Sequence, residues 1–133
     1  GEIDRLIQDY NNGGADYVCN HQDRLGSGYA DGFGAEIFKF SMLKSISKTK
    51  LSQLYKEHVT LYFWDHMDQI SVRSLQAPSA LNFPKLKFDV DTIEDFLMLE
   101  TLIENGVSIT SKAEEIIKVA EVLDDYIITT QNS

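Results

Sequence analysis

The sequence predicts a single α/β domain over residues 1–133, and three observations support this fold class. A chain of 133 residues has room for one domain with one hydrophobic core. Its hydrophobic fraction of 43% and its aromatic fraction of 11% are typical of a folded globular chain and exclude intrinsic disorder. Segments with the apolar spacing of helices alternate with short segments rich in β-forming residues, which favours an α/β architecture.

The first elements are a helix, two strands and a long loop. Residues 2–10 carry apolar side chains at helical spacing, and a glycine pair that begins at Gly13 is expected to end this helix. We predict strands over 16–19 and 35–40, where β-forming residues gather. Between them, residues 20–32 are rich in Gly, Asp, Asn and Ser and predict a long exposed loop, a kind of segment that often carries function.

The middle of the chain predicts two helices and a strand. Ser41 is expected to cap a short helix that continues through Ile46. Residues 51–66 predict one longer helix, because one face carries a helical stripe that comprises Leu51, Leu54, Tyr55, His58 and Tyr62. Residues 69–75 alternate between apolar and polar side chains, which indicates a half-exposed strand.

The last part of the chain predicts a strand followed by two helices. The strand covers residues 86–90, and the first helix covers residues 92–105 and ends at a glycine. Ser111 and Glu114 have the spacing of a capping box and predict a second helix that continues to about Asp125.

Two aspartates follow one another at the end of the predicted strand over 86–90. Successive strand residues point to opposite faces, so Asp89 and Asp91 are expected on the same face. Neighbouring carboxylates repel one another, and Mg²⁺ binds through one or two carboxylates together with waters and phosphates. The alternative is an ordinary helix start, in which Asp91 is the N-cap and Glu94 completes a capping box. The residues alone favour this helix start, because capping boxes are commoner than metal sites.

The charge of the chain is unevenly distributed. The formal net charge is −9, which argues against a nucleic-acid partner because its phosphates would be repelled. Five lysines and no acids lie between Lys39 and Lys56, whereas eleven acids and two lysines follow from Asp89 onward. A basic segment facing an acidic metal site would suit a phosphate-bearing substrate. The ordinary alternative is a solvated surface, and the pattern alone favours it.

The apolar segments and the single cysteine indicate a cytoplasmic protein without a membrane partner. No apolar run approaches the roughly 20 residues that a membrane helix needs, and no signal peptide is visible. Cys19 is the one cysteine, so it cannot form an internal disulfide, and this fits a reducing compartment. It lies in an apolar run with no histidine nearby and is expected to be a small buried side chain rather than a nucleophile.

Four short segments share their order and spacing with one known family. They read Gly-Ala-Asp-Tyr-Val-Cys-Asn over 14–20, Asp-Gly-Phe-Gly-Ala-Glu-Ile-Phe over 31–38, Lys-Glu-His-Val-Thr over 56–60, and Lys-Phe-Asp-Val-Asp-Thr-Ile-Glu-Asp-Phe over 87–96. Together they resemble the cytidylyltransferases that make CMP-activated acidic sugars, which include the CMP-sialic acid and CMP-KDO synthetases. The branch that serves spore-coat polysaccharide is the most similar. Each motif alone is weak, but four in order form a fairly specific signal.

The resemblance implies a fold, a reaction and a cofactor. The chain would form the C-terminal portion of a nucleotide-diphospho-sugar transferase-like, Rossmann-like three-layer sheet. In the implied reaction a sugar-acid oxygen attacks the α-phosphate of CTP, which releases pyrophosphate and gives a CMP-sugar for polysaccharide biosynthesis. The family's Asp-Thr aspartate binds the catalytic Mg²⁺, and that role falls on Asp91, with Asp89 as its partner.

The resemblance also implies three substrate contacts, each with an alternative. Glu36 matches the family's acidic strand and is expected to meet the sugar, or else to be a solvated strand carboxylate. His58 is a further candidate contact, although its apolar stripe favours a hydrogen-bonded core histidine. Lys56 replaces an arginine of the branch. Lysine keeps the positive charge but lacks the two parallel donors with which arginine binds a phosphate or carboxylate, and this argues against a binding role there.

One part of the family's pattern is absent from this sequence. Nothing resembles the glycine-rich basic loop that binds the CTP phosphates or the other metal-binding aspartate. We therefore expect a C-terminal half that does not turn over CTP alone and that works within an intact enzyme. The alternative is a noncatalytic binding or dimerisation module derived from this fold. A homo-oligomer is expected in either case, because the family builds its dimer contact from this half. The sequence identifies neither the sugar nor the base.

Overall fold

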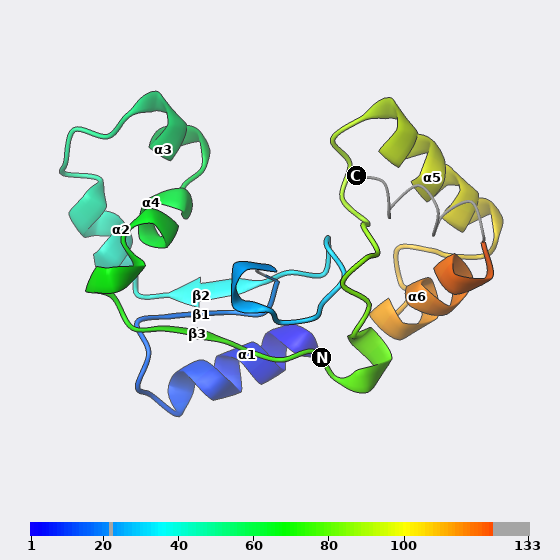
Figure 1. Cartoon of the computed structure of the whole chain (residues 1–133), viewed down its shortest axis with the longest axis horizontal. Helices are drawn as coiled ribbons and strands as arrows, with labels where there is room; N and C mark the ends of the chain where they lie inside the picture. The colour runs from blue at the N-terminus through cyan, green and yellow to red at the C-terminus, as the bar shows by residue number, and fades with distance from the viewer. Residues whose placement is uncertain (22, 124–133) are drawn as a thin grey trace. The chain divides into compact units, whose positions relative to one another are not determined.

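The computed structural model describes residues 1–21 and 23–123, which fold as two compact units (Figure 1). The first unit contains residues 1–19 and 35–75, and the second contains the described residues within 20–34 and 76–123. No helix within the described ranges has both the length and the apolar character needed to cross a bilayer. The α/β class is confirmed, whereas the single domain over residues 1–133 stays a prediction.

A three-stranded mixed sheet forms the centre of the first unit. Strand β1 (Tyr17–Cys19) lies between β2 (Glu36–Phe38) and β3 (Val72–Ser74). It pairs antiparallel with β2 and parallel with β3, so that Val18 lies opposite Ile37 on one side and opposite Arg73 on the other. Each strand lies inside the segment that the sequence predicts, but is shorter. Cys19 is fully buried in β1, as predicted.

Helix α1 (Glu2–Asn11) is joined to the sheet by the side chain of Arg73. The Arg73 Nε donates to Asp9 Oδ2 at 2.6 Å, and Nη2 donates to the carbonyl oxygens of Asp9 at 2.8 Å and Gly13 at 3.1 Å. Gly13 has a φ of 80°, a left-handed conformation that ends the helix where the sequence predicts it. A guanidinium fork thus fastens the helix end to β3.

Aromatic side chains form the core above the sheet face that Tyr17 occupies. The Tyr17 ring stacks on Phe38, with ring centroids 5.5 Å apart, and meets the edge of Trp64 at 5.3 Å. Phe63 also packs on both Tyr17 and Phe38. Phe63 and Trp64 are the buried residues of α4 (Leu61–Asp65), so this short helix covers the sheet through two large rings.

Two helix predictions in the first unit are wrong. Residues 51–66 form two short helices, α3 (Gln53–Glu57) and α4, because the chain leaves helical geometry at His58 (φ −106°, ψ 82°). The β-branched pair that follows His58 has low helix propensity, which favours the break. The helix predicted from Ser41 is α2 (Phe40–Ile46), whose N-cap is Lys39, so Ser41 lies inside it. A 3₁₀ turn, Met67–Gln69, then leads to β3.

The second unit has a core of its own between α5 (Ile93–Glu104) and α6 (Ala113–Val122). Two 3₁₀ turns, Asp23–Leu25 and Ser79–Leu81, belong to this unit as well. The buried members of the core are Tyr29, Ala30, Leu81, Leu86, Leu102, Ile117 and Ala120.

Two predictions for this unit need correction. The strand predicted over 86–90 is absent, because its backbone forms only an isolated bridge between Lys87 and Asp31, with no described strand beside it. Helix α6 is capped at Lys112, whose backbone N–H donates to Glu115 Oε2 at 3.0 Å, and not at Ser111. The Ser111 hydroxyl instead accepts from the backbone N–H of Ser108. The predicted end of this helix at Asp125 lies outside the described residues.

Candidate functional site

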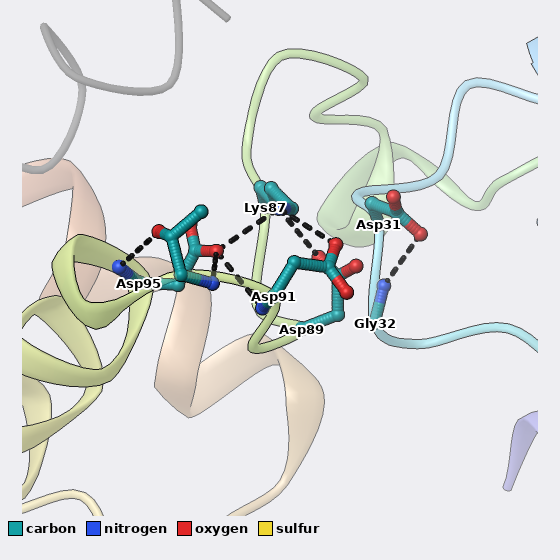
Figure 2. Close-up of polar contacts among 7 residues, drawn as sticks. Asp31, Gly32, Lys87, Asp89, Asp91 and Asp95 are labelled. Atoms are coloured by element: carbon teal, nitrogen blue, oxygen red, sulfur yellow. Dashed lines mark hydrogen bonds and ion pairs between the residues drawn. The ribbon is translucent and has the colours of Figure 1, made fainter.

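The two predicted metal ligands lie on the segment that enters α5, beside the loop that contains Asp31 (Figure 2). Two backbone hydrogen bonds join these segments: the Asp31 N–H donates to the Leu86 carbonyl, and the Phe88 N–H donates to the Asp31 carbonyl, each at 2.9 Å. This bridge brings residues 55 or more positions apart in the sequence into contact. It fixes the backbone directly before Asp89.

Gly32 makes this close approach possible. Its φ is +93°, and its N–H donates to the Asp31 side chain at 2.9 Å. A Cβ atom at this position would lie 2.8 Å from the Phe88 carbonyl carbon and 3.0 Å from the Asp89 nitrogen. Only glycine accommodates both the left-handed backbone and the neighbouring chain.

Lys87 is the centre of an acidic cluster, which we define as Asp89, Asp91 and Asp95. Its Nζ lies 3.1 Å from Asp91 Oδ2, 3.2 Å from Asp95 Oδ2 and 3.8 Å from Asp89 Oδ1 (Figure 2). These ion pairs, together with the hydrogen bonds to Asp91 and Asp95, raise the pKa of Lys87. The ammonium group therefore stays charged and compensates the repulsion among the three carboxylates.

The start of α5 is organised by Thr92 and Asp95. The Thr92 hydroxyl accepts from the Asp95 N–H, and Asp95 Oδ2 accepts from the N–H groups of Asp91 at 3.0 Å and Thr92 at 2.8 Å. The predicted capping box therefore exists, but its members are Thr92 and Asp95 and not Asp91 and Glu94. Because Asp91 is not the cap, its side chain is exposed apart from its contact with Lys87.

Asp89 is the more buried of the two predicted ligands. Burial raises the pKa of its carboxyl, the nearby Asp31 raises it further, and the Asp89 backbone and the Lys87 ammonium act in the opposite direction. Its Oδ1 atom is buried and accepts no hydrogen bond, with only the Lys87 Nζ at 3.8 Å. An ionised oxygen in that position is stabilised by a cation.

The donor set of this cluster fits a hard divalent ion. Asp89 and Asp91 offer carboxylate oxygens, and Mg²⁺ is commonly held by one or two carboxylates with waters and phosphates completing its shell. Among the residues that the structure describes, no group of three or more His, Cys, Asp or Glu side chains is arranged to hold a metal by itself. The assignment of Asp89 and Asp91 as metal ligands therefore stays a prediction.

The three predicted substrate contacts all lie in the first unit, whereas the acidic cluster lies in the second. Glu36 begins β2 opposite Cys19 and is half-buried. Burial raises the pKa of Tyr17, and the neighbouring Glu36 carboxylate raises it further. Lys56 is exposed at the end of α3. His58 is also exposed, so the interpretation as a core histidine is wrong. The role of these three residues as substrate contacts stays a prediction.

An apolar pocket of about 240 Å³ opens within the second unit and shares Gly32 and Phe88 with the bridge beside the cluster. Its wall is formed by Gly32, Phe33, Phe88, Leu99, Leu102, Ile103, Val107, Ser108, Ile109 and Ile116. Such a lining suits an apolar group and not a phosphate.

Sequence reasoning missed three residues of this site: Asp31, Lys87 and Asp95. Asp31 belongs to the segment over 31–38 that resembles the family, and no local pattern links it to Asp89. Lys87 and Asp95 flank the two aspartates at a spacing of four residues from Asp91, which was a usable signal. A strand at 86–90 would place Lys87 beside Asp89 but would not aim it at Asp95, so the strand prediction conceals this ion pair.

No family model matches the chain. It is 30% identical over 105 residues to the spore coat polysaccharide biosynthesis protein SpsF of Bacillus subtilis (strain 168). That match includes 78% of this chain but 41% of the relative, so the chain spans less than half of the relative's length.

A solved structure gives the second match. The cytidylyltransferase from Leptospira borgpetersenii serovar Hardjo-bovis (strain JB197) superposes with a TM-score of 0.72 at 22% identity. The superposition covers 99% of this chain and 53% of the solved one, and it shows that the two share a fold over that part. Together the two matches confirm the resemblance to the cytidylyltransferases, over part of their length.

Proposed function

We propose that this chain, a partial match to the cytidylyltransferases in sequence and fold, contributes metal ligands and part of the sugar pocket to a CMP-sugar-forming enzyme. The intact protein would transfer a cytidylyl group from CTP to an acidic sugar and release pyrophosphate, in polysaccharide biosynthesis. The acidic cluster at the start of α5 carries this proposal. The carboxylate oxygens of Asp89 and Asp91 both approach the same point, which the Lys87 ammonium group occupies.

In this proposal Asp91 and Asp89 hold Mg²⁺. The ion would neutralise charge that develops on the triphosphate of CTP. Asp91 is suited to this role because its side chain is 70% exposed, while Asp89 supplies a buried oxygen that accepts no hydrogen bond. The Thr92–Asp95 capping box fixes the backbone between them and the helix, so the ligands are held by a rigid element.

The candidate sugar contacts are residues of the first unit. We propose that Glu36 meets hydroxyl groups of the sugar, and that Lys56 and His58 are available to its acidic group. The small sheet would be one part of a three-layer, Rossmann-like sheet, and the intact enzyme would be a homo-oligomer. The chain matches 41% of the length of one relative and 53% of the other.

The competing proposal is a noncatalytic binding or dimerisation module derived from this fold. The coding sequence upstream of Gly1 distinguishes the two. A segment resembling Ala-Arg-x-Gly-Ser-x-Arg there supports the enzyme, because such a loop binds the CTP phosphates in the family. An unrelated upstream domain would favour the module.

The metal role is tested by replacing Asp91 with asparagine and titrating Mn²⁺ by calorimetry. We expect Asp91→Asn to weaken Mn²⁺ binding by at least about tenfold, because an anionic ligand is lost. Asp68→Asn is the matched control, since it removes the same charge from an exposed position in the other unit. Unchanged Mn²⁺ affinity in Asp91→Asn would reject the metal assignment.

A further inference from the structure

We propose that Lys87 is a built-in counter-ion of the acidic cluster, and that a divalent cation binds by displacing its ammonium group from Asp91 and Asp89. This inference rests on the proposed metal role of those two aspartates. It adds a residue that sets the affinity and the selectivity of the site for cations.

Lys87 differs from most lysines in the number of carboxylates near its ammonium group and in its low exposure to solvent. One ammonium group has three N–H donors, and here it lies within 4 Å of three carboxylates from three positions on the chain. Only 27% of the Lys87 side chain is exposed, whereas most lysines extend into water. Lys87 therefore places a positive charge at the centre of the cluster.

A metal and this ammonium compete for the same oxygens. An ion held by Asp91 Oδ2 would lie about 2.1 Å from that atom, and Lys87 Nζ lies 3.1 Å from it. The two cations would then be no more than about 5 Å apart, where like charges repel even in a solvated site. The ion therefore binds more tightly once the ammonium has left Asp91 and Asp89.

Asp95 offers the displaced ammonium a place to remain. Its Oδ2 already accepts the Asp91 and Thr92 N–H groups and lies 3.2 Å from Lys87 Nζ. Because Asp95 is fixed by the capping box, it is not a ligand that moves with the metal. Lys87 can release two carboxylates and keep the third through a change of side-chain rotamer, without movement of α5.

The test is Mn²⁺ titration of the chain by calorimetry, with three variants compared. We expect Lys87→Met to bind Mn²⁺ about tenfold more tightly, because the competing positive charge is gone. Lys87→Arg keeps the charge and is expected to bind within about threefold of the wild type. Lys85→Met is the matched control, since it removes a lysine that is exposed two residues away and has no described ion pair.

A metal-free measurement separates competition from a structural role. Without metal, Lys87→Met should have a lower melting temperature than the wild type, and saturating Mn²⁺ should raise it more than it raises the wild type. If Lys87→Met does not fold, the wild-type Lys87 side-chain NMR signals are followed instead, and these should shift when Mg²⁺ is added.

Two outcomes would overturn the inference. Mn²⁺ affinity in Lys87→Met that equals or falls below the wild-type value would show that the ammonium does not compete. Lys87 signals that stay unchanged on Mg²⁺ saturation would show the same. Failure of the metal role itself is distinguishable, because it appears as unchanged Mn²⁺ binding in Asp91→Asn.

Discussion

Gly32 determines how closely the loop at Asp31 approaches the segment that carries Asp89. Its backbone is left-handed, and the space where a Cβ would lie is filled by the Phe88 backbone. Gly13 is left-handed too, but nothing lies within 4 Å of the corresponding point. Alanine substitutions at the two positions therefore distinguish the energetic cost of backbone strain, present at both, from the cost of steric overlap, present only at Gly32.

We expect Gly32→Ala to destabilise the chain more than Gly13→Ala does. Backbone strain alone costs about 1–2 kcal/mol for alanine in this conformation, and overlap with Phe88 adds about 1–3 kcal/mol. Urea unfolding of both variants measures the difference in free energy of unfolding. Equal losses in the two variants would mean that the loop moves away without cost. Gly32→Ala is also expected to weaken Mn²⁺ binding, because it disturbs the backbone at Asp89.

At the scale of elements, the Asp95 carboxylate both caps the start of α5 and forms an ion pair with Lys87. Asp95 accepts two backbone N–H groups and one ammonium, and these interactions lower its pKa from 3.8 to about 2. The carboxylate therefore stabilises the folded state when it is ionised. That contribution is complete above the unfolded pKa of 3.8 and is lost as the pH falls towards about 2.

We expect Asp95→Asn to flatten the pH dependence of stability between 3.8 and about 2. The wild type should lose stability through this window, while the variant should lose less because its side chain does not take up a proton. Urea midpoints measured from pH 6 to pH 2 check this. Glu94→Gln serves as the control, since no hydrogen bond of its side chain is described, and it should keep the wild-type slope. Parallel curves for Asp95→Asn and the wild type would contradict the assignment.

At the scale of the whole molecule, α5 carries apolar side chains on more than its buried face. Leu102 is buried, yet Ile93, Phe96, Leu97 and Ile103 have exposed fractions of 74, 52, 53 and 63%. Apolar patches of this kind mark interaction surfaces.

We expect the chain to associate with itself through the side of α5 that carries these exposed apolar side chains. Light scattering should show a mass that rises with concentration, and Phe96→Glu with Leu97→Glu should lower it, because charge on the face opposes burial. Glu94→Gln is again the control. A constant monomer mass at high concentration would contradict the expectation.

Much of the secondary structure and the family resemblance could be predicted from local patterns. The helix over 2–10, the three strands and the two C-terminal helices follow from apolar spacing and from glycine stops. Two of the failures share one cause. Residues 51–66 have a helical stripe but break at His58, and residues 86–90 have a strand pattern without a neighbouring strand, so tertiary context overrode local preference.

The sequence by itself determined the α/β class, the positions of most elements and the two aspartates that a metal would need, because these depend on spacings of a few residues. Only the tertiary structure decided what surrounds the aspartates. Asp31 reaches Phe88 across more than fifty residues, and Lys87 meets three carboxylates because the segment is a bridge followed by a capped helix and not a strand. Such contacts depend on which backbones meet, and no short-range periodicity encodes that choice.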